Sequence, residues 1–116
     1  MGSSKMNNYQ HKDLADGRWA SLSFFEQMAN IGSEVIRSIN WKNKGNKEFS
    51  DLSFERALEL FDLTISDKKN IKRLKEVTRA RELFVDYLAF DNIYQSTDDF
   101  LKNYFYPFNY AANLHK

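Results

Sequence analysis

The sequence predicts an all-α fold, an antiparallel four-helix bundle with a kinked C-terminal helix. Apolar residues recur at spacings of three and four along most of the chain, which is the period of one helix face. One proline, four glycines and the lack of strand patterns argue against a loop-rich or all-β design. With 116 residues the chain has the size of one domain. We therefore expect a single helical domain over residues 16–116, after a polar, disordered segment over residues 1–15.

The first helix is expected to begin near Gly17 or Arg18, with Asp16 as its N-cap, and to end near Lys44. Its apolar positions form two adjacent rows: Leu22, Phe25, Ala29, Gly32, Ile36 and Ile39 in one, and Phe24, Met28, Ile31 and Val35 in the other. The apolar face is therefore wide. Gly45 follows the last turn and suits a left-handed C-cap.

The second helix is expected to start at Ser50 or Asp51, and Asp67 is expected to cap a third helix of about six turns. Each has one apolar stripe: Phe54, Ala57, Leu58, Phe61 and Ile65 in the second, and Ile71, Leu74, Val77, Phe84 and Leu88 in the third. Because the break between them is short, these helices should form a hairpin.

A loop over residues 91–95 should lead to the fourth helix, which starts at Ser96 or Thr97 and has Asp98 and Asp99 in its first turn. Its apolar face is formed by Phe100, Leu101, Tyr104, Phe105 and Phe108. Pro107 lacks an amide donor and its ring clashes with the preceding turn. We therefore expect this proline to kink the helix or to restart it.

The segment NYFYPFNYAA near the C-terminus has five aromatic rings in seven positions. In a helix, Tyr104, Phe105 and Phe108 share a face and fill the core, whereas Tyr106 and Tyr110 point elsewhere. Exposed tyrosines favour a subunit contact, although packing across the kink and stacking on a nucleic acid or ligand are alternatives. The predicted interface residues are Tyr106, Tyr110 and Phe108, with a homodimer or another protein as the partner.

Charge is nearly balanced overall, at +1, but the acidic segment 51–67 is followed by the basic segment 68–82. A nucleic-acid contact by this segment is one interpretation, and an ordinary solvated helix face is the other. The candidate residues are Lys68, Lys69, Lys72, Arg73, Lys75 and Arg79.

Arg81 lies in the apolar stripe of the third helix and should need a carboxylate partner, Glu59 or Asp62. With Glu34, these residues are the predicted buried polar groups, in a structural ion pair or a polar pocket. A third hypothesis is an enzyme whose acids pair with arginines across helices; the acids would be Glu26, Glu34, Glu59 or Asp62, and the arginines Arg37, Arg56 or Arg81.

No catalytic residue, metal ligand or cofactor is predicted. The chain has no cysteine, and its two histidines, His11 and His115, lie near the chain ends. It has neither the Glu-x-x-His motif of di-iron bundles nor a glycine-rich phosphate loop. No apolar run approaches the roughly 18 residues of a membrane span. We therefore expect a cytoplasmic protein that does not contact a membrane.

The segments RWASLSFFEQMANIGSEV, WKNKGN, ERALELFDLTI and RLKEVTRARELFVDY resemble a family of short, uncharacterised prokaryotic all-helical proteins. The architecture is also similar to HEPN-type bundles, some of which are RNases or toxin–antitoxin partners of minimal nucleotidyltransferases. The nuclease members have an arginine shortly before a histidine. Here no arginine precedes His11, and Arg81 is the nearest one before His115. The resemblance therefore implies a non-catalytic member.

Together these features predict a small helical interaction or regulatory module, a homodimer without a catalytic centre. The alternative is an RNA-binding or RNA-processing accessory protein that uses the basic third helix.

Overall fold

The structure, a computed structural model, describes residues 17–114. Within that range it contains four α-helices and no strand, so the predicted all-α class and helix number are confirmed. The elements in chain order are η3 (Trp19–Ser21), α1 (Phe24–Asn43), α2 (Lys47–Ser66), η4 (Lys68–Arg73), α3 (Leu74–Ala89) and α4 (Asp98–Asn113), where η denotes a 3-10 helix. The predicted disorder of residues 1–15 lies outside the described residues.

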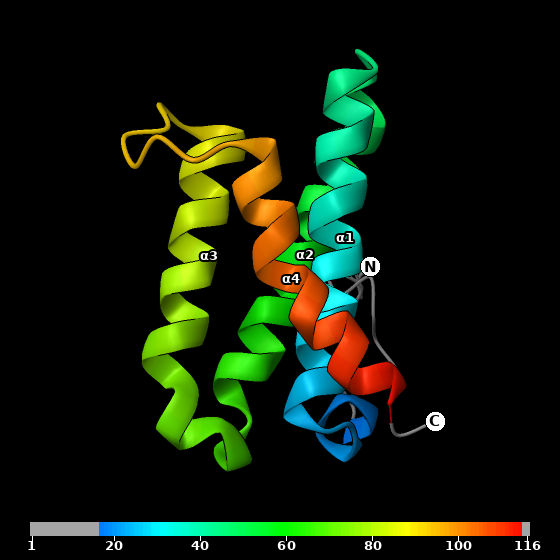
Figure 1. The fold of residues 1–116 in the computed structure, drawn as a ribbon, viewed down its shortest axis with the longest axis vertical. Coiled ribbons are helices and arrows are strands. Elements are labelled where there is room, and N and C mark those ends of the chain that lie inside the picture. The colour runs from blue at the N-terminus through cyan, green and yellow to red at the C-terminus, as the bar shows by residue number, and fades with distance from the viewer. Residues whose placement is uncertain (1–16, 115–116) are drawn as a thin grey trace, which may run out of the picture.

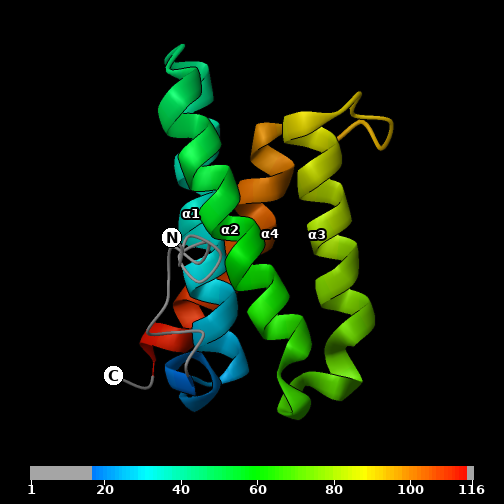
Figure 2. The same ribbon diagram turned by 180° about the vertical axis from the view of Figure 1, so that it is seen from behind.

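Consecutive α-helices run in opposite directions, as the colour ramp of Figure 1 shows. α1 packs along both α2 and α4, whereas α3 packs against α2 and approaches α4 at few positions. α4 lies in front of α1 and α2 in Figure 1 and behind them in the reverse view of Figure 2. α3 and α4 therefore lie next to each other on this side of the molecule, and we call the surface that they share the α3–α4 face; its residues are Glu76, Arg79 and Leu83 of α3 and Phe100, Tyr104, Tyr106 and Tyr110 of α4.

Helix α1 begins at Phe24, later than predicted. The Ser23 hydroxyl accepts a hydrogen bond from the Glu26 amide (3.1 Å), and the Glu26 carboxylate accepts one from the Ser23 amide (2.9 Å), which completes a capping box. Leu22 is extended, with ψ of 149°, so no helix can run through it. The chain before this point forms η3 instead and places Trp19 in the core.

A tight turn joins α1 to α2. Gly45 has φ of +80°, as expected for a left-handed residue after a helix. The Asn46 side chain then accepts a hydrogen bond from the amide three residues on (2.9 Å) and caps α2. The predicted start at Ser50 or its neighbour was wrong, because Asn46 is an equally good cap one turn earlier. Ser50 is buried, and its hydroxyl donates to the Ser38 carbonyl (2.8 Å).

The predicted third helix is divided in two. Asp67 caps the 3-10 helix η4, and α3 begins only at Leu74. At the junction Arg73 leaves helical geometry, with φ of −112° and ψ of 9°. The break leaves Ile71 exposed, so its predicted place in the core was wrong. Phe84, which lies within α3, is fully buried as expected.

Helix α4 begins as predicted. The Thr97 hydroxyl accepts from the amide three residues on (3.0 Å), and Asp98 and Asp99 lie in the first turn. The helix continues through Pro107 as one element, so the proposed restart is not observed. Pro107 is exposed, and water can therefore bond the carbonyl that its missing amide leaves unpaired. The kink stays a prediction.

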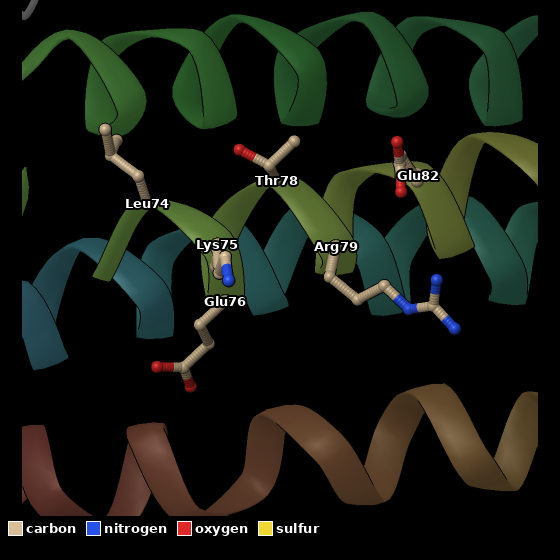
Figure 3. Close-up of a pocket in the computed structure, with 6 residues that line it drawn as sticks. All are labelled: Leu74, Lys75, Glu76, Thr78, Arg79 and Glu82. Carbon is tan, nitrogen blue, oxygen red and sulfur yellow. The ribbon is translucent and has the colours of Figure 1, made fainter. Parts of the chain in front are cut away.

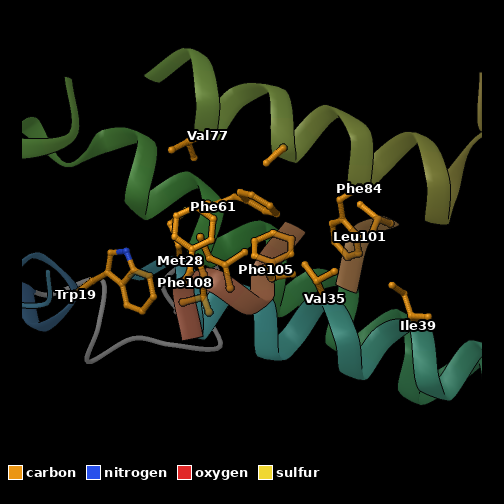
Figure 4. Close-up of a cluster of buried hydrophobic side chains, with 14 residues drawn as sticks. Trp19, Met28, Val35, Ile39, Phe61, Val77, Phe84, Leu101, Phe105 and Phe108 are labelled. Carbon is orange, nitrogen blue, oxygen red and sulfur yellow. The ribbon is translucent and has the colours of Figure 1, made fainter. Parts of the chain in front are cut away.

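Three phenylalanines connect the helices in the core. The Phe61 ring of α2 lies 6.1 Å from that of Phe84 in α3 and 6.4 Å from that of Phe105 in α4, measured between centroids (Figure 4). Gly32 brings α1 close to α4, because a Cβ at this glycine would lie 2.8 Å from the Cβ of Phe105. The inner side of α4 thus packs in the core, and only its outer side is available for other contacts.

Candidate interaction surface

The outer side of α4 carries an exposed apolar stripe. Tyr106, Tyr110 and Leu114 are 53%, 69% and 61% exposed and recur every fourth residue, so they follow one side of the helix. No charged side chain occurs over residues 103–114. Solvated helix faces are normally charged, whereas protein interfaces are enriched in tyrosine and depleted in charge. We call these three residues the α4 stripe; the predicted outward position of its two tyrosines is confirmed.

The opposite side of α4 faces the core. Phe105 and Phe108 are buried and Tyr104 is half-buried, as the helical spacing predicted. Phe108 was also expected at the interface, and this expectation does not fit the structure. Its ring packs edge-on against Phe24 of α1, with centroids 6.0 Å apart, because it lies one turn after Phe105 on the inner side.

An apolar groove separates α3 from α4. Its lining residues are Ala80 and Leu83 of α3 and Phe100, Leu101, Tyr104 and Phe105 of α4, with Glu76 and Arg79 at its edge. The volume is about 140 Å³, below the roughly 300 to 1,000 Å³ of small-molecule sites. Figure 3 draws a neighbouring open hollow on α3, and in that view Glu76 and Arg79 point from α3 toward α4, whereas Leu74 and Thr78 point toward α2. The groove suits side chains of a protein partner better than a metabolite.

Two tyrosine–carboxylate hydrogen bonds cross between α3 and α4. The Tyr104 hydroxyl of α4 donates to Glu76 Oε2 of α3 (3.2 Å), and the Tyr87 hydroxyl of α3 donates to Asp98 Oδ1 of α4. Each helix therefore supplies one donor and one acceptor. Because α3 approaches α4 at few other positions, these bonds help to set the width of the groove.

Burial and these bonds shift the ionisation of the bridging groups. Burial, together with Asp98, raises the pKa of Tyr87 to about 12. Burial and the neighbouring Glu76 also hold the pKa of Tyr104 above its ordinary value. Burial alone would raise the pKa of Asp98, but hydrogen bonds from Tyr87 and Asn43 outweigh it, so this pKa is lowered. At neutral pH the tyrosines are donors and Asp98 is a charged acceptor.

The loop of residues 90–97 presents apolar side chains on a fixed backbone. The buried Asp86 carboxylate accepts from the amides of Ile93 (2.9 Å) and the next residue (3.1 Å). Asn92 and Ser96 exchange two further bonds, of 3.0 and 2.9 Å. On this hydrogen-bonded loop, Phe90 and Ile93 are each 72% exposed. The sequence predicted this loop but not its apolar surface; the signal was the large apolar residues Phe90 and Ile93 on either side of the loop-forming pair Asp91 and Asn92.

Three of the six basic candidates contact other parts of the chain. Lys69 donates to the Ala20 carbonyl (3.1 Å) and also pairs with Asp67. The Arg73 guanidinium lies 4.4 Å from the centroid of the Phe24 ring. These contacts hold η4 against η3 and the start of α1, which is a structural role.

The third engaged cation is Arg79, whose guanidinium lies 4.8 Å from the centroid of the Tyr94 ring. Lys68, Lys72 and Lys75 are exposed. Residues 68–73 form a 3-10 helix with about three residues per turn, not the first turns of the continuous third helix that the sequence predicted. Side chains spaced by four therefore do not align across the junction with α3.

The predicted buried polar groups form two separate ion pairs. Arg81 Nε donates to Asp62 Oδ1 (3.0 Å), so this partner was predicted correctly, but the side chains are 33% and 62% exposed. The pair lies at the surface because Arg81 occupies the edge between α2 and α3. Glu34 is buried and pairs with Arg37 on the same helix (3.0 Å). Glu59 is half-buried.

A buried polar network that was not predicted joins the start of α1 to the end of α2. The Gln27 amide donates to the Trp19 carbonyl (2.9 Å) and to Asp67 (2.8 Å), and accepts from Asn70 (2.8 Å). The Trp19 indole donates to Thr64 (2.9 Å). Both amide hydrogens of Gln27 thus have acceptors. A network satisfied in this way is structural, and it explains why η4 departs from an α-helix to place Asn70 inside.

Over residues 17–114, no three His, Asp or Glu side chains are grouped so that they could hold a metal ion. His11 and His115 lie outside the described residues. None of the helices in the described part of the chain has both the length and the apolar character needed to cross a membrane.

Comparisons with known protein families, with curated proteins and with solved structures found no match to this chain. The resemblance to a prokaryotic family and to HEPN-type bundles therefore stays a prediction. The functional interpretation rests on the chemistry of the α3–α4 face.

Proposed function

We propose that this protein is a cytoplasmic, non-catalytic interaction module that forms a homodimer through the α4 stripe. The observation that carries the proposal is the uncharged, tyrosine-rich outer side of a helix whose inner side is already core. Protein interfaces are depleted in charged residues and enriched in tyrosine, and this side of α4 has both properties. A surface without charge can also face a copy of itself without like-charge repulsion.

The stripe alone is smaller than a stable interface. Tyr and Trp side chains bury on the order of 150 to 250 Å² each, whereas a standard interface needs about 800 Å² from each partner. Further exposed apolar side chains lie before α4 and in its first turn: Phe100 is 50% exposed, and Phe90 and Ile93 are 72% exposed. We propose that these side chains extend the contact beyond the stripe.

The test is sedimentation velocity at tens of micromolar, with circular dichroism to check folding. The wild type should sediment as a dimer, and Tyr106→Lys combined with Tyr110→Lys should give a folded monomer. The matched control is Leu52→Lys, because Leu52 is 37% exposed and belongs to α2 rather than to α3 or α4. A wild-type chain that stays monomeric would contradict the proposal.

RNA binding is the second candidate, and the exposure of Lys68, Lys72 and Lys75 favours it. Three phosphate contacts would give a logarithmic salt dependence with a slope of about −2 for single strands. In a gel-shift titration with mixed RNA at low salt, replacing the three lysines by glutamine should abolish retardation. If the wild type itself shows no retardation, this candidate is eliminated.

A further inference from the structure

We propose that the last turns of α1 bind single-stranded nucleic acid, with a base stacked on Trp41 and phosphates held by Arg37, Lys44 and Lys102. This site is separate from the α4 stripe and from the lysines of η4 and α3, so the inference does not depend on the homodimer.

The end of the α1–α2 hairpin projects from the molecule and is basic. In both Figure 1 and Figure 2, the turn between these helices extends beyond the ends of α3 and α4. The sequence over residues 35–47 contains four cationic side chains and no acidic one, although the net charge of the whole chain is only +1. The four cations are Arg37, Lys42, Lys44 and Lys47. A local excess of this kind attracts a polyanion.

An open hollow of about 420 Å³ lies along α1, just before the turn. Its lining residues are Ser33, Ile36, Arg37, Asn40, Trp41 and Lys44. The volume falls within the roughly 300 to 1,000 Å³ of small-molecule sites. The lining combines two cations, an amide and a hydroxyl with an aromatic ring, and none of these side chains is acidic. This combination suits a ligand that has a negative charge beside a planar ring, as each unit of a nucleic-acid strand has.

Trp41 provides the surface on which a base can stack. Its ring is half-buried and packs edge-on against that of Phe49, with centroids 4.9 Å apart, and this contact fixes its orientation. The Lys44 Nζ lies 5.1 Å from the centroid of the Trp41 ring, where a base would stack. Base stacking on an aromatic side chain is generally stronger than an exposed cation–π contact, so a base can displace the lysine. The displaced ammonium then becomes available to a phosphate.

The cations around the hollow can contact phosphates. The Arg37 side chain is 50% exposed although it pairs with Glu34, and its guanidinium has further donors. Lys102 of α4 donates to Asn40 Oδ1 (3.1 Å), which brings a cation from a second helix to the edge of the hollow. Over residues 17–114, no acidic side chain forms an ion pair with Lys44. Charge and ring therefore adjoin each other at one site.

Fluorescence anisotropy of a short, labelled, mixed-sequence single-stranded RNA at low salt tests the charges. Lys44→Gln with Lys102→Gln should weaken binding about ten-fold. It should also lower the slope of log K against log salt by about 1.4, since each phosphate contact contributes about 0.7. The matched control, Lys72→Gln with Lys75→Gln, removes the same charge from η4 and α3 and should have a smaller effect. If the control weakens binding as much as the first variant, the inference is overturned.

Trp41→Leu tests the stacking. It should weaken binding about ten-fold and leave the salt slope unchanged, because it removes a ring and no charge. The duplex form of the same RNA should bind more weakly, since its paired bases cannot stack on the protein. Unchanged affinity of a Trp41→Leu variant that circular dichroism shows to be folded would contradict the inference, as would a mononucleotide that binds as tightly as the strand. If Trp41→Leu does not fold, the two surface lysine changes still test the site. A wild type that does not bind the strand also overturns the inference, while sedimentation decides separately on the homodimer.

Discussion

Tyr104 of α4 donates a hydrogen bond to Glu76 of α3 across 3.2 Å and joins two helices that otherwise approach each other at few positions. Glu76 also accepts from Arg73 (3.5 Å), so its carboxylate keeps one partner if the tyrosine hydroxyl is removed. The ring of Tyr104 meanwhile packs edge-on against Phe105, with centroids 5.0 Å apart. The hydroxyl and the ring of this residue therefore have separable roles.

Tyr104→Phe should lower the free energy of unfolding by about 1 kcal/mol, the net value of one hydrogen bond. Tyr104→Ala should cost about 3 kcal/mol or more, because it also removes packing. Urea unfolding followed by circular dichroism measures both. Tyr106→Phe, on the exposed side of the same helix, is the control; measured at a protein concentration at which the chain is monomeric, it should change stability by less than about 0.5 kcal/mol. Equal effects of the two Tyr→Phe changes would show that the bond to Glu76 contributes nothing.

The Tyr87–Asp98 bond predicts a specific dependence of stability on pH. The folded-state pKa of Tyr87, about 12, is above its ordinary value of 10.0. The contribution of the Tyr87 hydroxyl to the free energy of unfolding is therefore complete below pH 10.0 and is lost as pH rises toward about 12. The pKa of Asp98 is lowered from 3.8, so its contribution is present above pH 3.8 and is lost as pH falls through the folded value.

In Tyr87→Phe, the free energy of unfolding should therefore depend less on pH than in wild type, at both the acid and the alkaline end. Urea midpoints measured from acid to alkaline pH provide the comparison. Tyr110→Phe, measured at a protein concentration at which the chain is monomeric, controls for the loss of a phenol hydroxyl on an exposed ring. An unchanged alkaline limb in Tyr87→Phe would mean that the bond does not persist in solution.

Gly32→Ala should destabilise the protein even though alanine favours helices. The added Cβ would meet the Phe105 side chain at 2.8 Å. Overpacking costs on the order of 1 to 3 kcal/mol, and the helix preference returns about 1 kcal/mol of it. Chemical denaturation should show a net loss of about 1 kcal/mol. Ser33→Ala, at an exposed position of the same helix, should be neutral or slightly stabilising. A more stable Gly32→Ala variant would show that α1 and α4 can move apart freely.

Asn70→Ala should cost about 2 kcal/mol, because it leaves the buried Gln27 Oε1 and the Thr64 carbonyl without this donor. Gln27→Leu should be similarly damaging. The double variant should lose less than the sum of the two, since the polar partners are removed together. Thermal unfolding of the four proteins completes this cycle, and Asn109→Ala at an exposed site is the control. Strict additivity would indicate that the two amides act independently.

The sequence by itself determined the helices and the direction of most side chains on them. Apolar residues at a period near 3.6 identified the faces of α3 and α4, so Phe84 and Phe105 were assigned to the core correctly. The same geometry showed that Tyr106 and Tyr110 point away from that core. Such predictions succeed because they depend on residues within one or two turns of each other.

Tertiary structure alone decided the features that join distant segments. Gln27 and Asn70 are 43 positions apart, so no local sequence pattern predicts the hydrogen bond between them. That bond nevertheless accompanies the 3-10 helix η4, where the sequence predicted an α-helix. The groove between α3 and α4 and the exposed apolar side chains of the 90–97 loop also depend on contacts between distant segments. They depend on how far α3 stands from α4, and this distance is set by packing and buried polar pairs rather than by periodicity.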